Sequence, residues 1–265
     1  ISFSQVGHST LFVTVDGLNI LTDPVWSDYA SPLQFMGPKR YTRPALDLDK
    51  LDVDVVLLSH THYDHLDYAT AVKIGNKPLW VVPLGVSDVL RGYGVTNVVE
   101  LDWWHSHTIS SNIPIEISLT PAKHWSSRNP FDRNRSLWGS FVVKSPNRSF
   151  FFGGDSAYHE VFKIIGKKYG PFDFAALPIG AYKPRWFLKD NHVNPEEAVQ
   201  IHKDIRSKQT VAIHWGTFPL SDEDYVEPPL ELGRVREIMS VAQDNFFTMM
   251  HGDTWIVGEP SGSDF

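Results

Sequence analysis

Cysteine is absent from the 265 residues of this chain, so disulfide bonds and thiolate metal ligands are both excluded. Any transition-metal site must therefore be built from histidine and carboxylate side chains. The sequence also lacks an apolar run of about 18 residues, and no segment is expected to cross a membrane as a helix. No secretory signal is visible, and because the sequence opens at Ile1 we expect an upstream segment in the parent protein.

Basic residues are in the minority, with 24 Lys and Arg against 31 Asp and Glu and a net charge of -7. This balance disfavours nucleic acid as a partner, since general binding usually needs a surplus of basic side chains on one face. Hydrophobic residues make up 42% of the chain and aromatic residues 13%, enough for a large buried core. No internal repeat or linker interrupts the chain, which predicts a single domain over residues 1–265.

Short apolar segments bounded by turn residues predict a series of β-strands. Two helices are predicted, at Tyr158–Ile165 and at Asn194–Ile205, the second with Asn194 as its N-cap. The stretch from Asp23 to Lys50 has poor periodicity and is expected to be a functional loop. This alternation predicts an α/β fold in which helices cover the sheets. The predicted strands are Ser2–Val6, Thr10–Val15, Leu18–Leu21, Val53–Leu58, Leu79–Val82, Val98–Leu101, Ile113–Leu119, Trp138–Val143, Ser149–Phe152, Phe174–Leu177 and Thr210–Ile213.

The densest group of potential metal ligands directly follows the predicted strand Val53–Leu58. It comprises His60, His62, Asp64 and His65. Histidine is the usual nitrogen ligand of zinc, and carboxylate oxygen is its common companion. Four such side chains at one strand-to-loop junction favour a metal site over ordinary polar surface residues.

Three later residues fit the same site, because each is delivered by the end of a predicted strand and such ends hold side chains rigidly. They are His124 after Ile113–Leu119, Asp155 after Ser149–Phe152, and His214 after Thr210–Ile213. Taken singly, each is equally compatible with an ordinary hydrogen-bonded residue. Together with the first group they predict a metal centre at one edge of the fold.

This order of ligands resembles the metallo-β-lactamase superfamily. The resemblance implies an α/β fold, an αβ/βα sandwich of two mixed β-sheets flanked by helices, with metals at the edge between the sheets. It implies that one metal takes His60, His62 and His124, and that the other takes Asp64, His65 and His214. Asp155 would bridge the two metals.

Longer strings are similar to the N-acyl-phosphatidylethanolamine-hydrolysing phospholipase D family, over roughly Gly7 to Gly252. The resemblance implies a phosphodiesterase that uses two Zn²⁺ ions and a bridging hydroxide, and that releases N-acylethanolamine and phosphatidic acid. From the resemblance we expect that the N-terminal extension of this family is missing from this chain. The strings include Leu21–Pro24, Phe35–Arg40, Glu100–Trp104, Leu137–Ser140, Pro178–Tyr182, His192–Ala198 and Ala212–Phe218.

The catalytic residues are assigned as His192 and the ligand Asp64. By resemblance His192 faces the reacting phosphate, as general acid to the leaving alkoxide or as a charge stabiliser, whereas spacing alone fits a helix-entry residue equally well. Asp23 is expected to hold a ligand histidine in its orientation from behind; a turn-initiating Asp before Pro24 is the alternative.

Substrate contacts are assigned to Lys39, Arg40, Arg185, Trp186 and His251. The first four lie in segments that interleave basic and apolar side chains, a pattern that suits an anionic lipid surface. The alternative places the aromatic side chains in the core and the arginines at its rim. His8 is placed with His251 at the rim of the site but is given no role.

The metal motif alone does not separate a lipid phosphodiesterase from a lactonase or a nuclease-type phosphodiesterase of the same superfamily. A catalytically inactive lipid-binding module is disfavoured, because no ligand of the pattern is missing. Iron or manganese would also suit these donors. The resemblance implies a phospholipid substrate and an intracellular, peripherally membrane-associated enzyme, and it is compatible with a homodimer.

Overall fold

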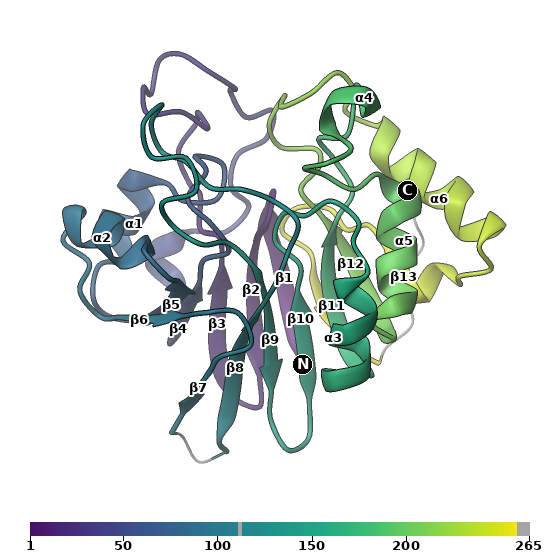
Figure 1. Ribbon diagram of the computed structural model, residues 1–265, viewed down its shortest axis with the longest axis horizontal. Coiled ribbons are helices and arrows are strands. Elements are labelled where there is room, and N and C mark those ends of the chain that lie inside the picture. Colours follow the sequence, from purple (N-terminus) through teal and green to yellow (C-terminus); the bar gives the residue numbers. More distant parts are fainter. Residues whose placement is uncertain (111–112, 259–265) are drawn as a thin grey trace.

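The computed structural model describes residues 1–110 and 113–258, so the last residues of the expected domain, 259–265, lie outside the described residues. Two seven-stranded sheets lie face to face (Figure 1). The first contains β1 (Ser2–Gly7), β2 (Thr10–Val15), β3 (Leu18–Thr22), β4 (Val55–Leu57), β5 (Leu79–Pro83), β6 (Val98–Leu101) and β14 (Thr254–Ile256). The second contains β7 (Ser106–Ile109), β8 (Ile115–Thr120), β9 (Ser140–Lys144), β10 (Ser149–Phe152), β11 (Phe172–Pro178), β12 (Ser207–Ile213) and β13 (Phe246–Phe247).

The first sheet has the order β14-β1-β2-β3-β4-β5-β6, antiparallel from β14 to β3 and parallel from β3 to β6. Helices α1 (Tyr68–Ile74) and α2 (Val86–Gly92) cover its outer face. There Trp80, Ala71 and Leu90 join one buried cluster. Strands β4 and β5 are therefore buried on both faces, which explains why they read as continuous apolar runs.

The second sheet has the order β13-β12-β11-β10-β9-β8-β7, antiparallel from β7 to β10 and parallel from β10 to β13. Its outer face is covered by α3 (Val161–Tyr169), α5 (Pro195–Asp204) and α6 (Glu227–Ile238). Asn194 accepts a hydrogen bond from the Glu197 amide at 2.9 Å, and the Glu197 carboxylate accepts one from the Asn194 amide at 3.2 Å. This reciprocal cap confirms the predicted start of α5.

A third apolar cluster fills the space between the sheets, where Val13 and Val55 of the first sheet meet Phe150 and Phe174 of the second. Helix, sheet, sheet and helix thus form four layers, which confirms the predicted αβ/βα sandwich. The helix predicted at Tyr158–Ile165 begins later, at Val161. The elements that the sequence did not predict are α1, α2, α4 (Arg185–Leu188), α6, β7, β13 and β14.

The stretch between β3 and β4 is irregular apart from an isolated bridge between Tyr29 and Lys39 and a 3₁₀ turn at Leu48–Lys50, as predicted. It rises above the strand ends at the top of Figure 1. Among the described residues, no helix combines the length and the apolar character needed to cross a membrane.

Candidate metal centre

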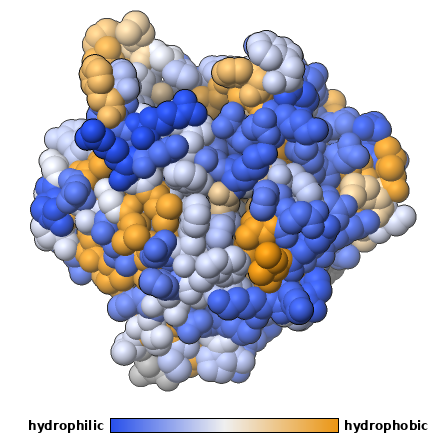
Figure 2. Space-filling view, in the orientation of Figure 1, coloured by the Kyte–Doolittle hydropathy of each residue, from blue (hydrophilic) through white to orange (hydrophobic). Residues whose placement is uncertain are grey.

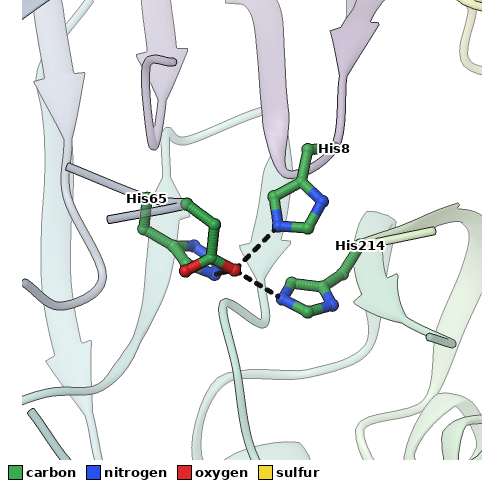
Figure 3. Close-up of side chains that lie close together, drawn as sticks. His8, His65 and His214 are labelled. Atoms are coloured by element: carbon green, nitrogen blue, oxygen red, sulfur yellow. Dashed lines mark hydrogen bonds and ion pairs between the residues drawn. The ribbon is translucent and has the colours of Figure 1, made fainter. Parts of the chain in front are cut away.

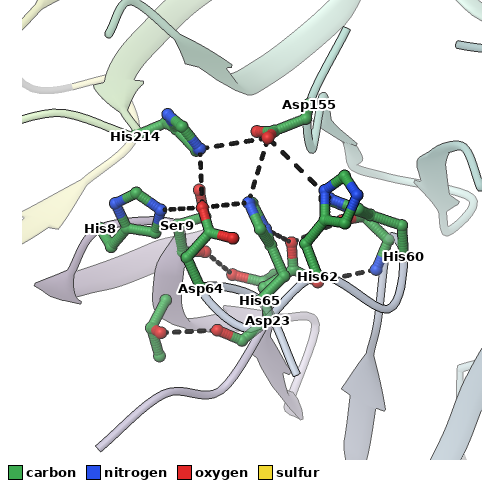
Figure 4. A network of polar contacts seen from close by, with 12 residues as sticks. His8, Ser9, Asp23, His60, His62, Asp64, His65, Asp155 and His214 are labelled. Atoms are coloured by element: carbon green, nitrogen blue, oxygen red, sulfur yellow. Dashed lines mark hydrogen bonds and ion pairs between the residues drawn. The ribbon is translucent and has the colours of Figure 1, made fainter. Parts of the chain in front are cut away.

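The ends of several strands meet at one edge of the sandwich and deliver the predicted ligands there. The His60–His65 loop follows β4, and His124, Asp155 and His214 follow β8, β10 and β12 respectively. These strands come from both sheets, so the ligands converge at the edge where the ends of both sheets meet (Figure 4). The structure brings all seven sequence-predicted ligands together, and their ring nitrogens and carboxylate oxygens face one another.

Three histidines form the first group. His62 Nδ1 lies 2.8 Å from His60 Nε2 and 3.2 Å from His124 Nε2. All three nitrogens lie within 4.8 Å of one another. This group can hold one metal ion.

The second group contains Asp64, His65 and His214. Asp64 Oδ2 lies 3.2 Å from His65 Nε2 and 3.2 Å from His214 Nε2. The side chain of Asp64 is 13% exposed, whereas both histidine side chains are completely buried. Solvent therefore reaches this second group past Asp64.

Asp155 stands between the groups (Figure 4). Its Oδ2 lies 3.1 Å from His214 Nε2 and 3.2 Å from His65 Nε2 in the second group. The same oxygen lies 3.7 Å from His124 Nε2 and 3.9 Å from His60 Nε2 in the first. Its other oxygen, Oδ1, is buried and has no hydrogen-bond partner among the described residues. A carboxylate that lies beside both groups and keeps a second, unpaired oxygen has the position that a bridging ligand requires.

The spacing of these atoms fits metal coordination. Four ligands at zinc bond lengths around a tetrahedral centre lie about 3.3 Å apart. The distances between the ligand atoms, 2.8 to 3.9 Å, bracket that value. Oxygen and imidazole nitrogen are also the donors that a divalent transition metal accepts in the absence of cysteine.

Hydrogen bonds behind the ligands fix which ring nitrogen faces the centre. Asp23 Oδ2 accepts from His65 Nδ1 at 2.6 Å and from Ser59 Oγ at 2.6 Å. Because Ser59 Oγ donates its proton to Asp23, it accepts from His60 Nδ1, 2.9 Å away. His124 Nδ1 donates to the Asn191 carbonyl at 2.9 Å. In all three rings the lone pair is left on Nε2, the atom that faces the centre.

The charge balance of the second group favours a cation. Burial alone would raise the pKa of the Asp155 carboxyl, but His214 and His65 together hold it well below its usual range. Burial alone would lower the pKa of His214, but Asp155 and Asp64 raise it to about 9. The two carboxylates are therefore stabilised by positive charge beside them. A bound metal ion would supply that charge in place of the protons on the histidines.

In the first group burial lowers the pKa of His60 well below its usual value and that of His62 to about 3, reinforced by neighbouring histidines. Neutral imidazole is the form that binds metal. This group therefore has the protonation state of a ligand set at neutral pH.

Close backbone approach at two glycines makes the cluster possible. A Cβ on Gly154, which has φ +57°, would lie 2.7 Å from Ser59 Cβ. A Cβ on Gly180 would collide with the carbonyl oxygen of His214. Asp23 and His214 themselves have positive φ values, 33° and 59°, which side chains other than glycine rarely adopt. Strained backbone thus occurs at the metal centre, as it also does at Asp16 and Arg206 elsewhere in the chain.

His192 lies at the rim of the cluster, just before α5. Its Nδ1 is 3.7 Å from Asp155 Oδ2, and its ring centre is 5.1 Å from that of His124. The side chain is 15% exposed, so it faces both the centre and the solvent.

The five residues assigned to substrate contacts are not gathered at one place. Lys39 is exposed and lies over the Tyr29 ring, and Trp186 is 85% exposed. Arg40 is buried and donates to the carbonyls of Val25 and Ser27. It is therefore a structural residue of the loop, contrary to the prediction of a substrate contact.

Arg185 also corrects the prediction. Its guanidinium is bound by the Glu197 carboxylate at 2.9 Å and by the His192 carbonyl at 2.8 Å. These bonds tie α4 to the start of α5 and leave the charge compensated within the fold. Arg185 therefore supports the position of His192.

His251 donates to or accepts from Thr42 Oγ1 through Nδ1 at 3.0 Å and lines a groove of about 1240 Å³. Trp215 and Gly216, the two residues after the ligand His214, line the same groove. Further apolar lining comes from Leu230, Phe247, Met249, Met250 and Trp255. The groove is thus largely apolar and includes the two residues that follow the ligand His214.

His8 is the site residue that sequence reasoning left without a role. It directly follows β1, and its Nε2 lies 3.0 Å from Asp64 Oδ2 (Figure 3). The available signal was its position at a strand end, the same signal that identified the ligands.

Comparisons with known proteins agree with this geometry. The family description "Beta-lactamase superfamily domain" matches residues 18–215. N-acyl-phosphatidylethanolamine-hydrolyzing phospholipase D 1 of Caenorhabditis elegans is 41% identical over 94% of this chain and 74% of that protein. The mitochondrial N-acyl-phosphatidylethanolamine-hydrolyzing phospholipase D of Saccharomyces cerevisiae is 39% identical over 88% of this chain and 51% of its own length. The solved structure of Igni18, a metallo hydrolase from the archaeon Ignicoccus hospitalis, superposes with a TM-score of 0.72 at 22% identity, covering 96% of this chain and 97% of that one.

Proposed function

This chain belongs to the family of N-acyl-phosphatidylethanolamine-hydrolysing phospholipases D within the β-lactamase superfamily and is a metal-dependent hydrolase, and we propose that it uses two zinc ions to hydrolyse N-acyl-phosphatidylethanolamine to N-acylethanolamine and phosphatidic acid. The observation that carries the proposal is the position of Asp155 Oδ2, 3.1 to 3.9 Å from ligand nitrogens of both groups. A shared carboxylate of this kind supports two metal positions over one.

The ligands divide between the proposed ions by group. His60, His62 and His124 hold one, Asp64, His65 and His214 hold the other, and Asp155 serves both. Two such cations offset the charge of a phosphodiester and make a water molecule acidic enough to attack it at neutral pH. No serine or cysteine nucleophile is then needed.

Two features of the surroundings favour a lipid diester over a small substrate. The groove lined by His251 and Trp215 is largely apolar and, at about 1240 Å³, has room for a fatty acyl chain. His192 stands at the rim of the centre, where it can donate a hydrogen bond to the leaving ethanolamide oxygen. The chain thus provides a charged position for the phosphate and an apolar one for a tail.

The bond that breaks distinguishes this reaction from its rivals. If water attacks phosphorus, turnover in heavy-oxygen water places the label in phosphatidic acid and none in the N-acylethanolamine. Mass spectrometry of both products measures this. Label in the ethanolamide alcohol, or release of free fatty acid, would falsify attack at phosphorus. A lactone or a nucleotide diester that is hydrolysed faster than the lipid would instead favour a lactonase or a nuclease-type phosphodiesterase.

We also propose that the enzyme approaches its substrate at a membrane surface through apolar side chains near the metal centre. Phe35 and Met36, in the loop that begins at Asp23, are 76% and 59% exposed. Trp186 and Phe187 of α4 are 85% and 62% exposed. Figure 2 shows apolar side chains on the raised loops at the top of the molecule and beside α4. The transfer of such side chains from water into the lipid interface lowers the free energy and so favours membrane binding.

Trp186→Ala combined with Phe187→Ala should weaken binding to vesicles of phosphatidylcholine and phosphatidylserine by about tenfold, because two exposed aromatic side chains are lost. Vesicle co-sedimentation measures the affinity. Turnover of a short-chain, water-soluble analogue should hardly change, and Ile164→Ala, an equally solvent-facing apolar side chain on α3, is the matched control. Equal losses on vesicles and on the soluble analogue would assign α4 to the reacting site instead.

A further inference from the structure

His8 is held between two elements that carry ligands of the second group. It directly follows β1 and has a left-handed conformation, with φ +54°. Its amide donates to Thr217 Oγ1 at 2.7 Å, and its carbonyl accepts from the His214 amide at 3.1 Å. These bonds join β1 to the loop after β12, so the ring of His8 has a fixed place beside His214.

The ring itself is turned toward Asp64. Its Nε2 lies 3.0 Å from Asp64 Oδ2, and the side chain is 2% exposed. Its other nitrogen, Nδ1, is buried without a hydrogen-bond partner among the described residues. An ionised carboxylate only accepts hydrogen bonds, so the ring proton sits on Nε2. Figure 3 shows His8, His65 and His214 directed at the same carboxylate oxygen.

The three rings around that oxygen are not equivalent. His65 and His214 also face Asp155, at 3.2 and 3.1 Å, so they point at the proposed metal position between the two carboxylates. With Asp64 and Asp155 they already give this position four possible ligands without His8. Among the described residues His8 contacts Asp64 and not Asp155, and the ring centre of Phe218 lies 5.2 Å from the ring centre of His8.

We propose that His8 is a positioning residue: it donates its Nε2 proton to Asp64 and so holds that carboxylate in place as a ligand of the second metal. The role rests on the proposed second metal position. Asp64 is the ligand that most needs such support, because it is the most exposed member of its group, at 13%. Without the donor, its carboxylate is free to turn toward solvent, and the ion bound by Asp64, His65 and His214 is lost first.

His8→Asn is the informative variant. Asparagine tolerates the left-handed backbone better than alanine does, and its shorter side chain leaves Asp64 without the donor. We expect the affinity for the zinc ion of the second group to fall by about 10- to 100-fold, as for other partners of metal ligands, with the ion of the first group unaffected. Competition with a chromophoric chelator measures both affinities without any turnover.

His8→Gln is the rescue variant, because its longer amide can place an N–H near the position of Nε2, and it should recover most of the lost affinity. His202→Asn is the matched control, since His202 is also a buried histidine, bonded to Thr210 at 2.8 Å, but lies on α5 outside the ligand groups. It should leave both zinc affinities unchanged.

Two results would overturn the role of His8. Wild-type affinity for both ions in His8→Asn would show that Asp64 needs no donor. Equal weakening in His8→Asn and His8→Gln, with the loss of a nitrogen ligand in the visible spectrum of the cobalt-substituted protein, would make His8 a metal ligand. A wild-type chain that binds a single ion would refute the second metal position itself, which is a failure of the dinuclear proposal and not only of His8.

Discussion

Asp155→Asn should abolish the binding of both metal ions at once, because one carboxylate serves both ligand groups. The neutral amide loses the negative charge that lies 3.1 Å from His214 Nε2 and 3.7 Å from His124 Nε2. Turnover of the lipid diester should fall by at least about 1000-fold, since both cations act on the same phosphate. Elemental analysis after dialysis measures the metal content, and a lipid assay measures turnover.

The design separates a bridging role from a general effect of lost charge. Asp173→Asn is the control. Asp173 lies near the start of β11, at the end of that strand away from the metal centre, and pairs with Lys208 at 2.8 Å, so this variant should retain both ions. His124→Ala should empty mainly the position of the first group. Loss of only one ion in Asp155→Asn would show that this carboxylate belongs to a single metal, and full activity with one ion would end the dinuclear mechanism.

Most of the metal ligands could be predicted from the sequence, because the pattern that identifies them involves only neighbouring residues. A parallel strand ends at a sheet edge, so a polar residue just after an apolar run must lie at that edge. His60, Asp155 and His214 all satisfy that rule, and the structure brings them together. The cap of α5 is equally local, since Asn194, Pro195 and Glu197 are close in sequence.

Long-range contacts were beyond the sequence. Arg40 and Arg185 are basic and lie next to apolar residues in sequence, as in a lipid-binding segment. In the structure, however, they bind backbone carbonyls and Glu197, and no sequence pattern predicts these bonds. His8 contacts Asp64, 56 positions away, only because the ends of β1 and β4 lie at the same edge of one sheet. Tertiary packing decided each of these cases.

Short or weakly patterned elements were missed for a different reason. Helix α6 begins with two prolines and buries only Pro228, Leu232 and Val235, so its apolar face is too sparse to be recognised. Strand β7 has no buried residue, and α4 is a single turn with none. Such segments adopt their structure because neighbours hold them, which local propensity does not report.

His192→Ala should lower turnover by about 10²- to 10⁴-fold while both metal ions remain bound, the signature of an interaction made only in the transition state. The backbone of His192 is well fixed: its carbonyl accepts from Arg185 at 2.8 Å, and its amide donates to the Leu188 carbonyl at 2.9 Å. The ring lies beside the ligand groups without belonging to either triad, so its removal should not release metal. Metal analysis and lipid turnover on the same preparation test both statements.

Varying the leaving group of the substrate then distinguishes whether His192 stabilises charge or transfers a proton. Burial lowers the pKa of His192 to about 3, so near neutral pH the ring is neutral and has one N–H to donate. If that N–H stabilises charge, His192→Gln should retain much of the turnover that His192→Ala loses. If the ring instead transfers a proton to the departing alkoxide, His192→Gln should fail like His192→Ala, and a phosphodiester with a nitrophenolate leaving group should restore turnover to both variants, because nitrophenolate departs without a proton. Loss of metal from His192→Ala, or normal turnover on the lipid, would remove His192 from the reaction altogether.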